Sequence, residues 1–236
     1  MRKRQYLGQH FLKSIKIARK IAESTDIKPS DVVLEIGSGK GILIPLLCEK
    51  AKRVLAYEKD PRIYVILQSK FKHLGNLELI CGDGFKTKKK FTKFVSNLPY
   101  SKSRKAIEWI AQQKFSKAVI MVQREFGDKL FASDPKERKA ISVVASYCLN
   151  IKKISNVDKS EFEPPPQISS IILEITKTSN LSADLIKTVN NIFSYRRKKI
   201  SNILSQFGIK SHDQERLDSL SSEEIINLAK RIQNKK

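Results

Sequence analysis

Residues 32–41 read VVLEIGSGKG, a strand-like apolar run followed by three glycines at alternate positions. An amphipathic, helix-like segment begins at Ile42, directly after the last glycine. Glycine allows a positive φ and lets the backbone approach a ligand without obstruction by a Cβ atom. A strand, a glycine loop and a helix in this order predict the first unit of an open α/β sheet, whose ligand crevice lies at the carboxyl ends of the strands.

Short apolar runs alternate with longer amphipathic segments from residue 31 to about residue 176, which predicts a parallel sheet covered by helices on both faces. The expected strands are Val32–Ile36, Val54–Glu58, Leu77–Cys81, Lys93–Asn97 and Ala118–Gln123. The expected helices include Ser14–Ser24, Ile42–Lys50 and Pro61–His73. Two later runs, Ile151–Val157 and Ile168–Ile175, have only a proline loop between them, which favours a terminal antiparallel pair.

A polar break at residues 177–182 ends this alternation. Three amphipathic segments follow it, near 182–194, 197–207 and 222–233. We therefore expect two domains, a large α/β domain over residues 1–178 and a small all-helical domain over residues 179–236.

The chain is strongly basic, with 46 Lys and Arg residues against 24 Asp and Glu residues and a formal net charge of +22. Such an excess is typical of proteins that neutralise phosphates and release their counterions. The basic residues cluster in three runs, Arg2–Arg4, Lys86–Lys93 and Arg196–Lys199. This distribution predicts contact with RNA or DNA.

The three cysteines lack metal-ligand spacing, and their odd number disfavours a disulfide framework. No apolar stretch reaches the length of a membrane span, and no apolar signal region follows the N-terminal charges. We expect a soluble, cytoplasmic protein that has no metal site and does not act at a membrane.

The glycine loop differs from a dinucleotide-binding loop, because its third glycine comes one position too early for Gly-x-Gly-x-x-Gly. Glu35 beside the loop also disfavours a pyrophosphate. A carboxylate in this place suits S-adenosylmethionine, which carries a sulfonium and an ammonium group and no phosphate.

Acidic residues also end the next two strands. Glu58 is placed to accept both hydroxyls of a ribose, and Asp83 to accept an adenine amine. A single acid at a strand end is more often a helix cap than a ligand, but three acids at consecutive strand ends favour a site. The candidate cofactor residues are Glu35, Gly37, Gly39, Gly41, Glu58, Lys59, Asp83 and Gly84.

The fourth strand ends in Asn97-Leu98-Pro99-Tyr100. Pro99 restricts Leu98 to extended geometry, so the Leu98 carbonyl and the Asn97 amide oxygen can together accept both hydrogens of an adenine amine. Tyr100 can stack on a base that has left its helix. Together with the cofactor loop, the tetrapeptide predicts methyl transfer to a nucleic-acid amine, driven mainly by positioning. The alternative is an ordinary strand-terminating turn.

Phe162 precedes Glu163 and three prolines, and it is a second candidate catalytic residue. It can cover the other face of the base, or it can be a hydrophobic plug under the loop. The sequence favours neither alternative.

These motifs resemble the small-subunit ribosomal RNA adenine dimethyltransferases of the kasugamycin-resistance type. The matching stretches are Gly8–Leu12, Glu35–Gly41, Glu58, Gly82-Asp83, Asn97–Tyr100, Gln123–Glu125, Phe162–Ser170 and Arg196–Lys199. The resemblance implies a Rossmann-like class I methyltransferase with a mostly parallel seven-stranded sheet whose last strand is antiparallel. His10 stands where many members have Asn, and Ser38 replaces a proline common in bacterial members. Together with the short helical domain, these departures favour an archaeal-like member.

The resemblance also implies the activity, which is N6,N6-dimethylation of two adjacent adenosines in a hairpin near the 3′ end of small-subunit rRNA during ribosome biogenesis. It also places Gln9, His10, Leu12 and Asn97 at the cofactor, beside the candidates already named. It further implies that the C-terminal helices dock on the immature small ribosomal subunit. Nothing in the sequence suggests an obligate partner, so we expect a monomer.

Three other functions stay open from the residues. A sister enzyme methylates one adenine of large-subunit rRNA and shares both motifs, so the catalytic residues do not separate the two. A non-catalytic RNA-binding assembly factor would not need the acids at the strand ends. A DNA adenine methyltransferase would act on duplex DNA and show no preference for ribosomal particles.

Overall fold

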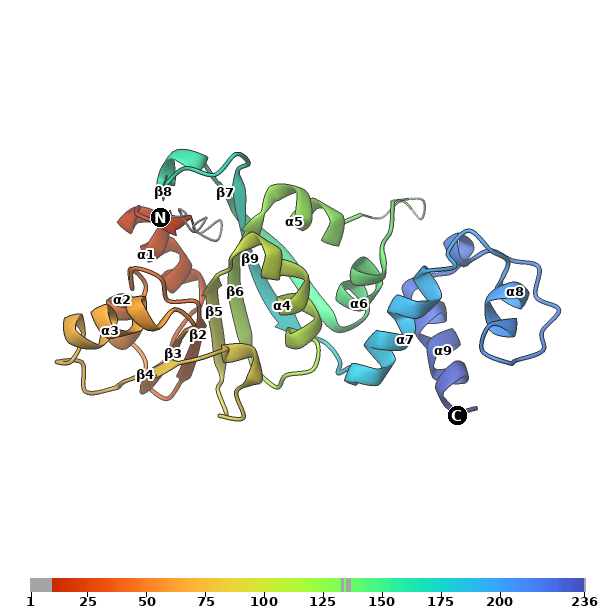
Figure 1. The fold of residues 1–236 in the computed structure, drawn as a ribbon, viewed down its shortest axis with the longest axis horizontal. Helices are drawn as coiled ribbons and strands as arrows, with labels where there is room; N and C mark the ends of the chain where they lie inside the picture. The colour runs from red at the N-terminus through yellow and green to blue at the C-terminus, as the bar shows by residue number, and fades with distance from the viewer. Residues whose placement is uncertain (1–9, 133, 135–136, 236) are drawn as a thin grey trace, which may run out of the picture. The chain divides into compact units, whose positions relative to one another are not determined.

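A computed structural model describes residues 10–132, 134 and 137–235 of the protein. It contains a seven-stranded sheet in the order β4-β3-β2-β5-β6-β9-β7 (Figure 1). The strands of this sheet are β2 (Val32–Ile36), β3 (Arg53–Glu58), β4 (Leu77–Cys81), β5 (Lys93–Asn97), β6 (Lys117–Gln123), β7 (Leu149–Val157) and β9 (Ser170–Lys177). The five strands from β4 to β6 are parallel to their neighbours, and β9 runs antiparallel to β6. The expected Rossmann-like methyltransferase sheet is confirmed, and each strand boundary lies within two residues of its expected place.

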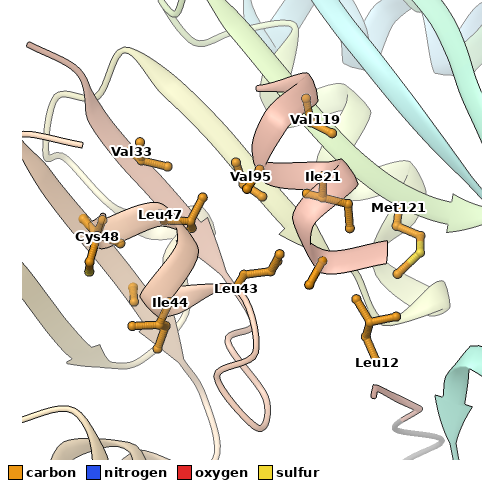
Figure 2. Close-up of a cluster of buried hydrophobic side chains, with 14 of the residues drawn as sticks. Leu12, Ile21, Val33, Leu43, Ile44, Leu47, Cys48, Val95, Val119 and Met121 are labelled. Atoms are coloured by element: carbon orange, nitrogen blue, oxygen red, sulfur yellow. The ribbon is translucent and has the colours of Figure 1, made fainter. Parts of the chain in front are cut away.

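Three helices cover one face of the sheet, namely α1 (Ile15–Ser24), α2 (Ile44–Cys48) and α3 (Pro61–Lys70). The Ser14 and Asp60 side chains cap α1 and α3 by accepting hydrogen bonds from Ile17 N and Arg62 N. Ile21 of α1 is fully buried in the same apolar cluster as Val119 and Met121 of β6, as Figure 2 shows. This core fixes the strands whose ends carry the candidate site.

The chain forms two compact units. The sheet unit comprises the described residues up to 103, then 114–124 and 151–176, and the helical unit comprises 104–113, 125–150 and the described residues from 177 on. The helices from α4 on are α4 (Ser103–Ile110), α5 (Arg124–Leu130), α6 (Ala140–Cys148), α7 (Ala183–Phe193), α8 (Ile200–Ser205) and α9 (Ser222–Gln233). The last three match the expected C-terminal segments. Within the described residues, no helix is long and apolar enough to cross a membrane.

Helix α6 is not predicted by the sequence pattern, and it contacts both α7 and α9 in the helical unit. Its residues are apolar almost all round, and seven of the nine are buried. A helix with this pattern has no polar face and shows no helical periodicity. Burial between neighbours, rather than the preference of Val143 and Val144 for strands, therefore decides its structure.

The glycine loop after β2 turns the chain and also packs closely against neighbouring side chains. Gly37, Gly39 and Gly41 adopt φ values of 80°, 54° and 75°, in the left-handed region that favours glycine. A Cβ atom on Gly41 would lie 2.5 Å from Cε2 of Phe71 and 2.7 Å from Cδ2 of Leu67. Gly41 is thus required for close packing of the loop against α3 and the residue that follows it.

Substituting Gly41→Ala adds overpacking and left-handed strain, and we expect it to lower the free energy of unfolding by about 3 kcal/mol. Gly75→Ala is the matched control, because its Cβ would meet no atom within 4 Å and its φ is outside the left-handed region. It should leave stability unchanged or slightly raised. Urea unfolding followed by circular dichroism measures both, and equal effects would contradict the packing role of Gly41.

Candidate functional site

The candidate residues follow four parallel strands that are neighbours in the sheet. The central strand, β2, pairs with β3 on one side and β5 on the other, and β3 pairs with β4. Because parallel strands end at the same edge, the loops after Ile36, Glu58, Cys81 and Asn97 all leave the sheet there. The expectation that these strand ends lie together agrees with the observed topology.

The glycine loop and the Asn97 turn lie side by side. Gly37 N donates a hydrogen bond of 2.8 Å to the carbonyl oxygen of Tyr57, which ties the loop to β3. A Cβ atom on Gly37 would lie 3.9 Å from Cδ of Pro99, which is van der Waals contact. The two motifs recognised separately in the sequence therefore form one surface.

Glu35 supports the glycine loop through a hydrogen bond with Ser38. Its side chain is buried, at 1% exposed, and its Oε2 accepts a hydrogen bond of 2.8 Å from Ser38 Oγ. The pKa of Glu35 is raised to about 7. Burial is the largest cause, the Ser38 hydrogen bond opposes it, and the nearby Glu58 carboxylate adds a smaller rise. The carboxyl group therefore titrates near neutral pH and supports the loop through Ser38.

Glu58 joins the loop to the turn that begins α3. Its side chain is also buried, and its two oxygens accept hydrogen bonds of 2.9 Å from Gly39 N and Asp60 N. Carboxylate oxygens can accept more than one hydrogen bond each, so these bonds orient the group and leave capacity for hydroxyls of a ligand. Lys59, the next residue, is exposed.

Asp83 has a local structural role after β4. It caps the short 3-10 helix η1 (Gly84–Lys86) by accepting a hydrogen bond of 3.0 Å from Phe85 N. Gly84 packs tightly, because a Cβ atom on it would lie 2.7 Å from Cγ1 of Ile36. The capping alternative considered for a single strand-end acid is thus present at Asp83, at the same sheet edge as the other acids.

The tetrapeptide is anchored at both ends. Asn97 pairs with Met121 of β6 and is partly exposed, while the Leu98 side chain is buried. Tyr100 begins the 3-10 helix η2 (Tyr100–Lys102), and its hydroxyl lies 3.0 Å from Ser170 Oγ. Burial raises the pKa of Tyr100, so the phenol is neutral at physiological pH. The hydrogen bond to Ser170, a fully buried residue of β9, restrains the Tyr100 ring.

A short N-terminal strand completes the site. The strand β1 (Phe11–Leu12) pairs antiparallel with β8 (Phe162–Glu163). His10 donates from Nδ1 to the carbonyl oxygen of Pro164 at 2.8 Å, and its ring centroid lies 5.8 Å from that of Tyr100. Phe11 lies against the glycine loop, because a Cβ atom on Gly39 would be 3.0 Å from Phe11 Cδ1. Gln9, a candidate cofactor residue, lies outside the described residues.

Two candidate side chains lie in the core. Phe162 is 1% exposed and Leu12 is 3% exposed, and both belong to the apolar cluster between the sheet and α1. In this structure Phe162 presents no face to a base, which favours the hydrophobic-plug alternative over stacking. Leu12 can meet a ligand only through its main chain. Their depth follows from the pairing of β1 with β8.

Phe11 and Ser170 belong to the site but were not singled out individually. Phe11 lies within the Gly8–Leu12 stretch, and Ser170 ends the Phe162–Ser170 stretch, both of which carried the family resemblance. A two-residue strand has no periodicity, and a serine hydroxyl gives no sign of its distant partner. The only signal in the sequence for Phe11 and Ser170 is that both lie in stretches that match the family.

Comparisons with known proteins match nearly the whole chain. A family model described as "Ribosomal RNA adenine dimethylase" matches residues 1–236. Ribosomal RNA small subunit methyltransferase A of Thermotoga neapolitana is 35% identical over 239 residues, which cover 97% of this chain and 91% of that protein. The probable ribosomal RNA small subunit methyltransferase A of Methanosarcina barkeri is 34% identical over 204 residues, which cover 83% and 71%. The bacterial and the archaeal relative are thus about equally similar to this chain. The assignment to an archaeal-like member therefore stays a prediction.

A solved structure has the same fold. The crystal structure of a dimethyladenosine transferase from Plasmodium falciparum superposes with a TM-score of 0.81 at 25% identity, covering 96% of this chain and 98% of that one. The similarity therefore extends over both compact units.

Protonation of Glu35 predicts a specific pH dependence of stability. The pKa of Glu35 is raised in the folded protein. Its contribution to the free energy of unfolding is therefore fully present below the ordinary pKa of 4.5 and is lost as the pH rises through about 7. Glu35→Gln removes this loss, and we expect its stability relative to the unaltered protein to increase by on the order of 3 kcal/mol from pH 4 to pH 8.

Urea unfolding at both pH values measures this difference. The exposed Glu49→Gln is the control and should show no such change with pH. A Glu35→Gln effect that is the same at pH 4 and pH 8 would contradict the assignment.

Proposed function

The chain belongs to the ribosomal RNA adenine dimethylase family, and from this premise we propose that it transfers methyl groups from S-adenosylmethionine to N6 of two adjacent adenosines in a hairpin near the 3′ end of small-subunit rRNA. The observation that carries the proposal is the closeness of the glycine loop to the Asn97 turn, where a Cβ atom added to Gly37 would lie 3.9 Å from Pro99 Cδ. This arrangement brings a loop suited to the cofactor next to acceptors suited to an adenine amine.

The charge beneath the loop supports this cofactor. Glu35 and Glu58 are both buried at adjacent strand ends, where an unpaired negative charge is costly and a cation is favoured. When bound, S-adenosylmethionine would supply a methyl group on a sulfonium, with no phosphate for these acids to repel. Glu58 would hold the ribose hydroxyls, Asp83 the adenine amine, and the main chain at Gly37 the amino-acid end.

The N-terminal segment would close over the cofactor. Phe11 already lies against Gly39, and β1 is held by its pairing with β8. We assign cofactor contacts to Gln9, His10 and the main chain of Leu12. The exposed Lys59 would lie beside the ribose.

The chain's own part in catalysis is to hold the amine. The Asn97 amide oxygen and the Leu98 carbonyl would accept the two N6 hydrogens, which directs the nitrogen lone pair toward the methyl group. The sulfonium is a good leaving group, so positioning supplies most of the acceleration and no strong base is required. Tyr100, restrained by Ser170, would stack on the flipped adenine. Phe162 would support the loop from the core.

The names of the relatives support the choice of the small subunit. We assign catalysis to residues 1–178 and docking on the immature ribosomal subunit to residues 179–236, with Arg196–Lys199 as a basic contact between α7 and α8. The protein would act as a monomer in the cytoplasm. The large-subunit enzyme remains the alternative, because its catalytic motif is the same.

Mass spectrometry of rRNA tests this function directly. Isolated small and large ribosomal subunits are incubated with the protein and labelled S-adenosylmethionine, and the modified bases are mapped. We expect two adjacent N6,N6-dimethyladenosines in the small-subunit rRNA. A product in the large-subunit rRNA would contradict the proposal, and the absence of both a product and cofactor binding by calorimetry would indicate an assembly factor.

Asn97→Ala removes one of the two acceptors for the amine. We expect it to reduce methyl transfer by about 100-fold or more, the range for loss of one preorganised polar contact, while the Kd for S-adenosylmethionine changes by less than about tenfold. Single-turnover transfer and calorimetry give the two values. Asn150→Ala, at an exposed position, is the control and should change neither. Equal losses in transfer and cofactor affinity would show that Asn97 acts mainly on the cofactor.

Variants of Tyr100 separate stacking from anchoring. Tyr100→Ala removes the ring, and we expect kcat/KM to fall by about 10- to 100-fold, since base stacking contributes about 1–3 kcal/mol. Tyr100→Phe keeps the ring and loses only the Ser170 hydrogen bond, so a fall of about tenfold at most is expected.

Ser170→Ala should match Tyr100→Phe, and the double variant should be no worse than either, because both remove the same bond. Additive losses would show that the two residues act independently. Tyr100→Phe as damaging as Tyr100→Ala would contradict the stacking role.

A further inference from the structure

The crossover between β4 and β5 is unusual for a parallel sheet. The strands β4 and β5 are parallel but not adjacent, since β3 and β2 lie between them. Such strands are commonly joined by a crossover helix that covers the face of the sheet. Here residues 82–92 form only the 3-10 helix η1 and an irregular segment. A hollow of about 520 Å³ lies there, lined by Tyr57, Gly82, Asp83, Lys86, Thr87, Lys88 and Lys89.

The wall of this hollow is held by hydrogen bonds. The Tyr57 hydroxyl donates to Thr87 Oγ1 at 2.9 Å, and Lys89 N donates to the same oxygen at 3.1 Å. The Asp83 cap fixes the start of η1. These hydrogen bonds attach the lysine-containing segment to β3 and to the end of β4.

The hollow has more positive charge than its acids neutralise. Glu78 forms ion pairs with both Lys89, at 2.8 Å, and Arg53. Lys86, Lys88 and Lys90 are exposed, and within the described part of the chain none of the three forms an ion pair. Three uncompensated cations at alternate residues repel one another, and a polyanion would relieve that repulsion.

We propose that this lysine-lined hollow, defined by Lys86, Lys88, Lys90 and the lining residues above, binds the phosphodiester backbone of the substrate RNA. The inference rests on the proposed function. A strand of RNA offers one negative charge per nucleotide, which suits a row of cations better than a single phosphate does. Asp83 belongs to both the lining and the candidate site, so the hollow adjoins the sheet edge at which the adenosine would be methylated.

The salt dependence of RNA binding tests the inference. Fluorescence anisotropy measures the Kd of the full chain for a fluorescein-labelled RNA hairpin with two adjacent adenosines in its loop, over a series of KCl concentrations. Lys86→Gln/Lys88→Gln/Lys90→Gln should weaken binding and lower the slope of log Kd against log [KCl] by about 2, since each single-strand phosphate contact contributes about 0.7. Its unchanged affinity for S-adenosylmethionine would show that the variant is folded.

The control removes the same charge elsewhere on the sheet unit. Lys50, Lys52 and Lys72 are exposed. They precede β3 and β4 and so lie toward the amino ends of the strands, away from the carboxyl ends that carry the hollow. Their triple Gln variant should keep nearly the slope of the unaltered protein. Equal slopes for the two triple variants, or no hairpin binding by the unaltered protein, would overturn the inference.

A competition arm separates an RNA strand from a free nucleotide. Unlabelled hairpin should displace the probe at far lower concentration than ATP does, and equal potency would overturn the assignment to RNA. These outcomes are distinct from failure of the proposed function. That failure would be a lack of methyl transfer by the unaltered protein, whereas failure here leaves transfer intact while the two triple variants bind alike.

Discussion

The candidate site depends on two buried carboxylates at the ends of adjacent parallel strands. Glu35 supports the glycine loop through Ser38, and Glu58 supports it through Gly39 N. A buried carboxylate is costly to ionise without compensation, and burial accordingly raises the pKa of Glu35 to about 7. A proton or a cationic ligand meets this requirement, while a pyrophosphate would worsen it. The constraint that shapes the loop thus also selects the kind of cofactor.

The remaining parts of the site come from distant segments that the sheet brings together. The glycine loop meets the Asn97 turn at Pro99, and it meets the N-terminal strand at Phe11. Tyr100 is held by Ser170, seventy residues later, and faces His10 from the start of the described chain. Each contact fixes a group whose position matters for an amine acceptor or a stacking face. These contacts hold the site residues in place, which suits catalysis by positioning.

Much of this arrangement could be predicted from the sequence. The strands are continuous apolar runs bounded by turns, so both their limits and the glycine loop were recognisable. The helix α6 was not, because it is buried nearly all round and lacks a polar face. The pairing of Phe11–Leu12 with Phe162–Glu163 involves two residues on each side, too few for a pattern. That pairing decides the depth of Phe162, so its burial could not be read from composition or spacing. The partner of Tyr100 could not be read either, because Ser170 lies seventy residues away on β9.

A crystal structure with S-adenosylhomocysteine bound tests the central claim most directly. The account predicts the ribose hydroxyls within hydrogen-bonding distance of Glu58, the adenine at Asp83, and the sulfur beside the glycine loop and facing Asn97. A nucleoside bound away from Glu58, or a sulfur directed away from Asn97, would contradict it.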